Sequence, residues 1–87
     1  VVATNARLDK VEANKLAQMA HNGPALAIRP AHTMYDGDTL FTLATGHKNA
    51  DVNILGAFAP FVVANAILNA VRYASSAGDI PSANSLP

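Results

Sequence analysis

The sequence contains no cysteine and no tryptophan, and its other aromatic residues are few. The absence of cysteine excludes disulfides, thiolate metal ligands and a cysteine nucleophile, so any chemistry must use oxygen or nitrogen groups. With three Phe and two Tyr residues, the core must be built mostly from Ala, Val, Leu and Ile. Eighty-seven residues allow at most one small domain.

An excess of either charge is also absent, because six basic side chains balance six acidic ones. No run of one sign forms the footprint of a nucleic-acid or anionic-membrane partner, so neither partner is predicted. The histidines, His21, His32 and His47, do not have the one-turn spacing that brings two imidazoles together on one helix face. We therefore predict no metal site and no cofactor.

The hydrophobic pattern predicts alternating strands and helices along the first half of the chain. We expect a strand over residues 1–6 and a helix over 10–21, the latter begun by Asp9, with Glu12 completing a capping box. Gly and Pro then introduce a short helical piece over 25–28. A second strand is predicted over 39–45.

That second strand is expected to end at Gly46, with a polar loop over 46–50 after it. Asp51 then caps the longest apolar stretch, 52–71, which carries no charged side chain. We prefer a buried helix to a membrane span for this stretch because it contains three Asn residues, and Pro60 should kink or split it. Residues 77–87 are predicted to be a surface tail behind a domain portion at 1–76.

The predicted fold class is α/β or α+β, with layers of helix and sheet. Two strands leave edges and faces unpaired and do not form a sheet that is stable alone. The missing strands should come from another chain. The sequence opens at Val1, without Met and inside a predicted strand, so we also expect residues upstream of it.

Asp36 and Asp38 form the most concentrated acid pair, on either side of Gly37. Two carboxylates at a strand entrance can face one cleft, where one holds an amine or hydroxyl and the other tunes its proton. An ordinary Asp-Gly turn with two solvated carboxylates is the alternative, and spacing alone favours it. A calcium loop is less favoured, because the further ligands are missing.

The remaining polar residues favour structural roles. His32 beside Thr33 is expected to be a structural histidine that bonds a loop carbonyl, and His47 to be solvated. Arg29 could bind a carboxylate or the last carbonyls of a helix. No threonine lies in a Gly-x-Ser-x-Gly type of elbow, so the chain shows no nucleophile of its own.

Three stretches of the chain together resemble one family. These are residues 1–8, 27–41 and 50–53, with Ala20-His21 between the first two. The most specific stretch reads His-Thr-Met-Tyr-Asp-Gly-Asp-Thr-Leu-Phe, from His32 to Phe41. The pattern resembles the small β subunit of the L-aminopeptidase/D-esterase family, which includes β-aminopeptidases and nylon-oligomer (6-aminohexanoate-oligomer) hydrolases. It is more similar to the nylon-hydrolase branch.

The resemblance implies a precursor that cuts itself and so exposes an N-terminal Thr, or Ser in aminopeptidase members, as the nucleophile. That residue should fall just before Val1, so it is assigned neither to Val1 nor to Thr4. Asp36 and Asp38 match the acidic residues beside the nucleophile, which makes a catalytic role the preferred interpretation. The resemblance also implies a four-layer αββα sandwich completed by a larger α subunit. That subunit would supply a lysine and an asparagine, and the heterodimers would assemble into tetramers.

The function implied is hydrolysis of linear amides or oligoamides through an acyl-enzyme. The first alternative is an aminopeptidase that releases N-terminal residues from short peptides or β-peptides. A second alternative is a non-catalytic interaction domain whose apolar helix docks on a larger partner, and an acyl-transfer role has no motif in its favour. The expected location is cytoplasmic.

Overall fold

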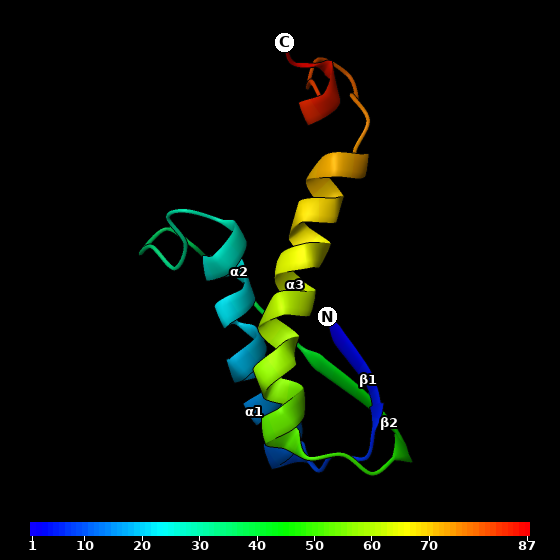
Figure 1. The fold of residues 1–87 in the computed structure, drawn as a ribbon. Coiled ribbons are helices and arrows are strands. Elements are labelled where there is room, and N and C mark those ends of the chain that lie inside the picture. Colours follow the sequence, from blue (N-terminus) through cyan, green and yellow to red (C-terminus); the bar gives the residue numbers. More distant parts are fainter.

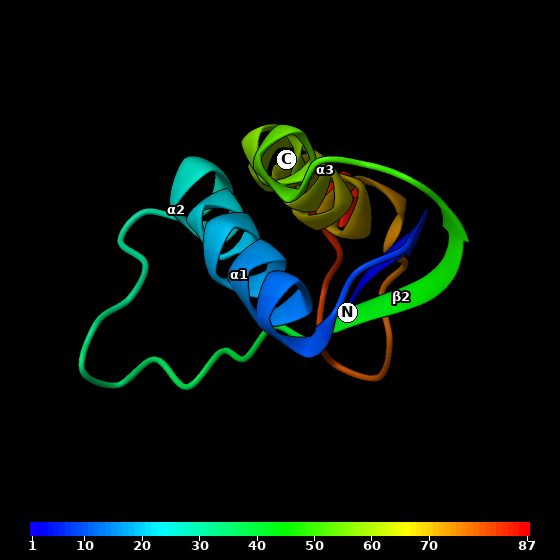
Figure 2. The same cartoon turned by 90° about the horizontal axis from the view of Figure 1, so that it is seen from below.

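Helices and strands alternate along the chain, and the computed structural model describes all of residues 1–87 (Figure 1). The elements are β1 (Val2–Ala6), α1 (Lys10–Ala20), α2 (Asn22–Ala27), β2 (Thr42–Lys48), α3 (Val52–Tyr73) and a 3₁₀ turn at Ala83–Ser85. Seen along α3, the strands lie on one side of the helices and the long α2–β2 connection swings out on the other (Figure 2). The mixed α+β class predicted from the sequence is confirmed.

Aspartate caps begin both long helices, as predicted. Asp9 Oδ1 accepts a hydrogen bond of 2.8 Å from the amide of Glu12, and Asp51 Oδ1 accepts one of 2.7 Å from the amide of Asn53. Each carboxylate satisfies an amide that has no partner within its helix. The side-chain contact with Asp9 also raises the pKa of Glu12, because the two carboxylates lie close together.

The short second helix begins earlier than predicted. It starts at Asn22, directly after α1, instead of at residue 25. Pro24 fits inside its first turn, where a helix needs no amide donor, so Pro24 does not delay the start. Gly23 and Pro24 are both buried, which places the beginning of α2 against the rest of the molecule.

The two strands pair in parallel, with Val2 opposite Thr42 and Thr4 opposite Ala44. Predicted strand 39–45 is shifted in the structure, because pairing begins at Thr42 and continues beyond Gly46 to Lys48. The predicted polar loop at 46–50 is therefore wrong in its first half. Gly46 adopts φ +82°, and the register changes between Thr4 and Ala6, so the strand absorbs the glycine as an irregularity.

Small residues bring the helices close together. Leu16, Ala20 and Ala59 form the buried centre between α1 and α3. A Cβ on Gly23 would lie 2.6 Å from Val63 Cβ, which shows how closely α2 approaches α3. Pro60 is buried at this crossing, and α3 runs through it as one helix, so the expected split does not occur.

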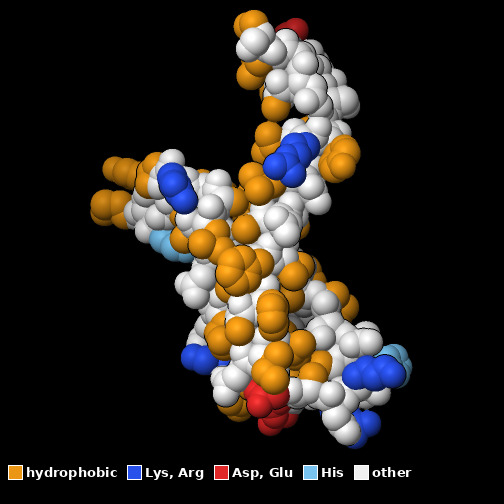
Figure 3. Space-filling view, viewed as in Figure 1, with side chains coloured by type: hydrophobic (Ala, Val, Ile, Leu, Met, Phe, Trp, Pro, Cys, Tyr) orange, Lys and Arg blue, Asp and Glu red, His pale blue; other side chains and the backbone are white.

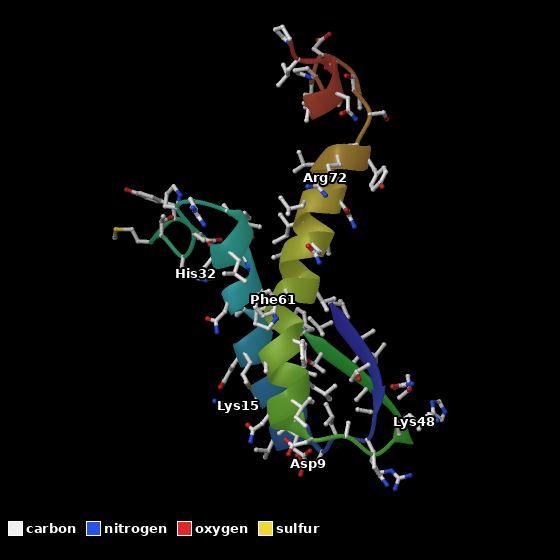
Figure 4. All side chains as sticks on the ribbon, viewed as in Figure 1. Asp9, Lys15, His32, Lys48, Phe61 and Arg72 are labelled. Atoms are coloured by element: carbon white, nitrogen blue, oxygen red, sulfur yellow. The ribbon has the colours of Figure 1, made fainter.

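The molecule is nevertheless open. Its Cα radius of gyration is 15.3 Å, whereas a compact domain of this length would have about 12 Å. It exposes 6503 Å², about 1,600 Å² more than the roughly 4,900 Å² of a typical globular protein of its mass. Apolar side chains gather along the visible face of α3, and Phe61 projects from its middle (Figures 3 and 4).

Length and composition alone would let α3 cross a membrane. The same test is passed by core helices of soluble proteins, so it is weak evidence. The helix packs on α1 and α2 through Gly56, Ala59, Pro60 and Ala64, and most of its remaining surface is exposed. The predicted buried helix is thus buried along one side only.

The C-terminal segment is more ordered than the predicted surface tail. Ala77 and Ile80 form an isolated antiparallel bridge, and the 3₁₀ turn follows. Asn84 Nδ2 donates a hydrogen bond of 2.7 Å to the carbonyl of Arg72, at the end of α3. Polar contacts of this kind tie the exposed segment to the helix without burying it.

Candidate active site

The acid pair lies on an exposed connection between α2 and β2, which we call the acid loop (residues 29–41). This loop leaves the end of α2 and returns past α1 to the start of β2 (Figure 2). Almost none of its side chains is buried; Met34 and Tyr35 are over nine-tenths exposed. Its shape must therefore come from polar contacts within the loop.

Asp36 supplies most of those contacts. Its Oδ1 accepts a hydrogen bond of 3.0 Å from the amide of Asp38, and its Oδ2 accepts one of 3.0 Å from the amide of His32. The amide of Asp36 itself donates to the carbonyl of Thr33 at 3.0 Å. The two carboxylate oxygens of Asp36 thus bind one backbone amide that precedes Asp36 and one that follows it.

These hydrogen bonds also fix the charge of Asp36. The Asp38 amide, followed by the His32 amide, stabilises the ionised carboxylate and lowers the pKa of Asp36 below its ordinary 3.8. The His32 Nδ1 atom lies 3.9 Å from Asp36 Oδ2 and acts in the same direction. At neutral pH the Asp36 carboxylate is therefore ionised, and it fixes the loop through its two hydrogen bonds.

Asp38 differs from Asp36 because its carboxylate accepts no hydrogen bond from the backbone; its side chain interacts with that of Asp36 and helps to lower the pKa of Asp36. It lines a polar pocket of about 300 Å³ between the returning acid loop and α1. We call this the α1 pocket, and its lining residues are Asn14, Ala17, Gln18, His21, Asp38, Thr39 and Leu40. The two aspartates therefore differ: Asp36 holds the backbone of the loop, and Asp38 lines the α1 pocket.

His32, in the acid loop (Figure 4), contacts the residue that ends α1, His21. Its ring meets that of His21 edge to face, with centroids 4.6 Å apart, and its backbone has the left-handed φ of +58°. The sequence predicted a histidine that bonds a loop carbonyl. Instead, the His32 amide bonds a carboxylate, and the ring packs on another imidazole.

The other candidates lie away from the acid pair. His47, expected to be solvated, is exposed on β2, where its Nδ1 lies 3.0 Å from Thr45 Oγ1. Arg29 makes no ion pair, and no group of three or more His, Asp or Glu side chains could hold a metal ion. The chemistry available at this site is therefore that of carboxylates, hydroxyls and imidazoles.

The beginning of the chain lies close to the returning end of the acid loop. The Val2 amide donates a hydrogen bond of 2.7 Å to the carbonyl of Phe41, one residue before β2. The two strands run in the same direction, with Thr4 beside Ala44 and Val2 beside Thr42. Residues nearer the start of β1 therefore lie beside residues nearer the start of β2. The sequence alone could not predict this pairing.

Sequence comparison decides the family. Residues 1–82 match the model of peptidase family S58. The chain belongs to this family.

The relatives of this S58 chain include both kinds of enzyme that its motifs resemble. An uncharacterized aminopeptidase of Mycobacterium leprae is 42% identical over 93% of this chain and 26% of its own length. A 6-aminohexanoate-oligomer endohydrolase of Kocuria sp. is 33% identical over 82% of the chain and 24% of its own length. A further endohydrolase, from Paenarthrobacter ureafaciens, is 34% identical over 79% of the chain and 23% of its own length. No solved structure matches the chain significantly.

The chain thus spans about a quarter of the length of the curated relatives it matches. The suspected family is confirmed. Of the relatives described here, the aminopeptidase shares more identity with the chain than either endohydrolase does.

Sequence reasoning found the acid pair but missed the α1 pocket. The sequence pattern gives Asn14 and Gln18 no functional role, and His21 enters it only as one of the three histidines and as part of the family resemblance. Their spacing of four and three residues, one turn of helix each, places them in one stripe. This spacing can be read from the sequence. The position of the acid loop opposite these residues cannot.

Proposed function

We propose that this chain forms the smaller portion of a self-processed amide hydrolase whose nucleophile is a threonine just upstream of Val1. The observation that carries the proposal is the position of β1. If the parallel pairing of Val2 with Thr42 continued backward, the residues before Val1 would run beside Leu40, Thr39 and Asp38. A nucleophile a few residues upstream would then meet the acid pair.

In this proposal the two aspartates have different tasks. Asp36 keeps the acid loop in shape. The Asp38 carboxylate stabilises the ammonium of the new N-terminus and orients the hydroxyl beside it. Asp36 is a positioning residue and Asp38 the catalytic one. The low pKa of Asp36 agrees with a group that remains ionised throughout.

The reaction would proceed in two steps. The threonine oxygen attacks the amide carbonyl while the neutral N-terminal amine takes the hydroxyl proton, and that proton passes to the departing amine. Water then attacks the resulting ester, which releases the acid and restores the hydroxyl. The oxyanion is stabilised by groups of a larger companion subunit, for which a lysine and an asparagine are expected.

The open shape of the chain supports such a companion. The excess exposed area of about 1,600 Å² is far more than the roughly 800 Å² that each partner buries in an interface of ordinary size. One face of the sheet is bare, with Leu43 more than half exposed. Further strands and a second sheet layer from the companion would complete the proposed four-layer sandwich, and the heterodimers would pair further into tetramers.

An aminopeptidase is the second candidate, because the Mycobacterium leprae relative shares more identity with the chain than the endohydrolases do. The two candidates share their chemistry and differ in where the substrate ends. An aminopeptidase requires a free amine on the residue it releases, whereas an endo-acting amidase accepts a blocked one. Hydrolysis of a matched pair of free and acetylated linear amides separates them.

The proposal is tested first by intact-mass analysis and N-terminal sequencing of the full-length polypeptide that contains this chain. We expect two chains, the smaller beginning at a Thr or Ser a few residues before Val1. Asp38→Asn should then lower kcat/KM for linear amides by about a hundredfold or more. Asp36→Asn should have a smaller effect, because an amide oxygen can still accept one of the two loop hydrogen bonds.

Asp79→Asn serves as the matched control, since Asp79 is exposed in the C-terminal segment and forms no ion pair. It should leave kcat/KM unchanged. A single uncut polypeptide, or full activity in Asp38→Asn, would contradict the proposal and favour the interaction-domain alternative.

A further inference from the structure

Two parts of the acid loop are held against the rest of the molecule by different contacts. The returning part is fixed by Leu40, which packs on the buried centre, and by the hydrogen bond of 2.7 Å from the Val2 amide to the carbonyl of Phe41. The outgoing part has no apolar residue at that centre. Its link to α1 is the ring of His32, which lies edge to face on His21, with ring centroids 4.6 Å apart.

The backbone of His32 has a conformation that few residues other than glycine adopt. Its φ is +58°, in the left-handed region, and such a backbone persists where the surrounding contacts require it. In this conformation the His32 amide donates a hydrogen bond of 3.0 Å to Asp36 Oδ2, while the ring lies on His21. The turn thus lets one residue contact the carboxylate of the loop and the end of α1 at the same time.

His21 is the other half of this contact. Its Nε2 atom is buried and makes no hydrogen bond within the chain. The same side chain lines the α1 pocket, as does Asp38. His21 therefore faces the acid loop on both sides of Asp36, in contact with His32 and across the α1 pocket from Asp38.

We propose that His32 is a positioning residue, whose ring contact with His21 holds the acid loop so that Asp38 lies beside the reacting centre. Asp36 carries this constraint across the loop, because its carboxylate accepts hydrogen bonds from the amides of both His32 and Asp38. The inference rests on the proposed function, which places the reacting centre at Asp38. The hold on the loop itself can be measured without a substrate.

Two variants of the full-length protein separate the ring from the backbone. His32→Asn removes the ring, and asparagine still accepts the left-handed backbone. We expect it to lower kcat for the p-nitroanilide of 6-aminohexanoic acid about tenfold and to leave KM unchanged, because a small displacement of Asp38 slows the chemical step. His21→Phe retains an aromatic ring and loses no hydrogen bond, so it should keep most of the wild-type kcat.

A double variant tests whether the two rings act together. If they do, His21→Ala combined with His32→Asn should have the same kcat as His32→Asn alone. Hydrogen exchange of the acid-loop peptides, measured by mass spectrometry, should be about tenfold faster in His32→Asn and unchanged in His21→Phe. His47→Asn removes an exposed imidazole on β2 and is the control, which should alter neither kcat nor exchange.

The outcomes distinguish this inference from the proposed function. Unchanged kcat and exchange in His32→Asn would overturn the inference, while hydrolysis by the wild type upheld the proposed function. A higher KM with kcat intact would also overturn it, since His32 would then bind substrate, and additive effects in the double variant would show that the rings do not act through each other. Absence of hydrolysis by the wild type would overturn the proposed function and the inference together.

Discussion

The helix crossing and the acid loop are held together in opposite ways. At the crossing of α2 and α3, Gly23 and Pro60 are buried and backbone lies almost against side chain, so sterics determine the geometry. In the acid loop almost nothing is buried, and the hydrogen bonds of one carboxylate, Asp36, maintain its shape. A scaffold can thus be rigid through packing while its chemical site depends on a single polar residue.

Among variants that affect either the helix crossing or the acid loop, Gly23→Ala at the crossing should have the largest effect on stability. The new methyl would meet Val63 Cβ at 2.6 Å and the carbonyl oxygen of Pro60 at 2.8 Å, and neither can move freely. We expect a loss of about 2–3 kcal/mol in the free energy of unfolding. Urea denaturation of the full-length protein measures it.

Gly56→Ala is the matched control. There the added methyl would contact the flexible thioether of Met19, which can turn away, and alanine favours the helix over glycine. Its unfolding free energy should stay within about 1 kcal/mol of wild type. If both variants lost the same free energy of unfolding, the close approach of α2 to α3 at Gly23 would not be the cause of the loss.

A smaller loss is expected from Asp9→Ala, which removes the cap of α1. The amide of Glu12 loses its acceptor, and the free energy of unfolding should fall by about 1 kcal/mol. Asp9→Asn retains a side-chain oxygen and should retain most of the stability. A similar loss in both variants would point to charge instead of capping, and the salt dependence of unfolding would then identify it.

The smallest and most local effect concerns the acid loop. Asp36→Ala should leave the midpoint of global unfolding unchanged but speed hydrogen exchange of the His32 and Asp38 amides, which lose their acceptor. Unchanged exchange at both amides, measured by NMR, would mean that something other than Asp36 shapes the loop.

The hydrogen bonds of the Asp36 carboxylate predict that the order of the acid loop decreases at low pH. Because folding lowers the pKa of Asp36, its contribution to loop order is fully present above the ordinary value of 3.8 and is lost as pH falls through the lowered value. The NMR titration of the Asp36 carboxyl carbon should therefore have its midpoint below 3.8. A midpoint at or above 3.8 would contradict the hydrogen-bonded geometry.

Local signals in the sequence predicted the local structure well. The caps at Asp9 and Asp51 were found because a short polar side chain before an apolar run has one main use. The predicted end of β2 at Gly46 is wrong because glycine commonly ends a strand, whereas pairing with β1 accommodates Gly46 as an irregularity. That outcome depends on β1, which is distant in sequence.

The candidate site was predicted in part for the same reason. Asp36 and Asp38 could be singled out from their spacing and from the family resemblance, but their difference could not. Which carboxylate binds backbone and which faces the α1 pocket depends on how His32 turns the loop at φ +58°. No pattern of residue types encodes such a turn.

The parallel pairing of β1 with β2 also has an entropic consequence. The strand contacts close a loop of about forty residues, whereas each helix is made from neighbours in sequence. The entropy cost of closing such a loop rises only with the logarithm of its length. Insertions in the exposed acid loop should therefore cost little stability, provided that the strand pairing at its end is kept.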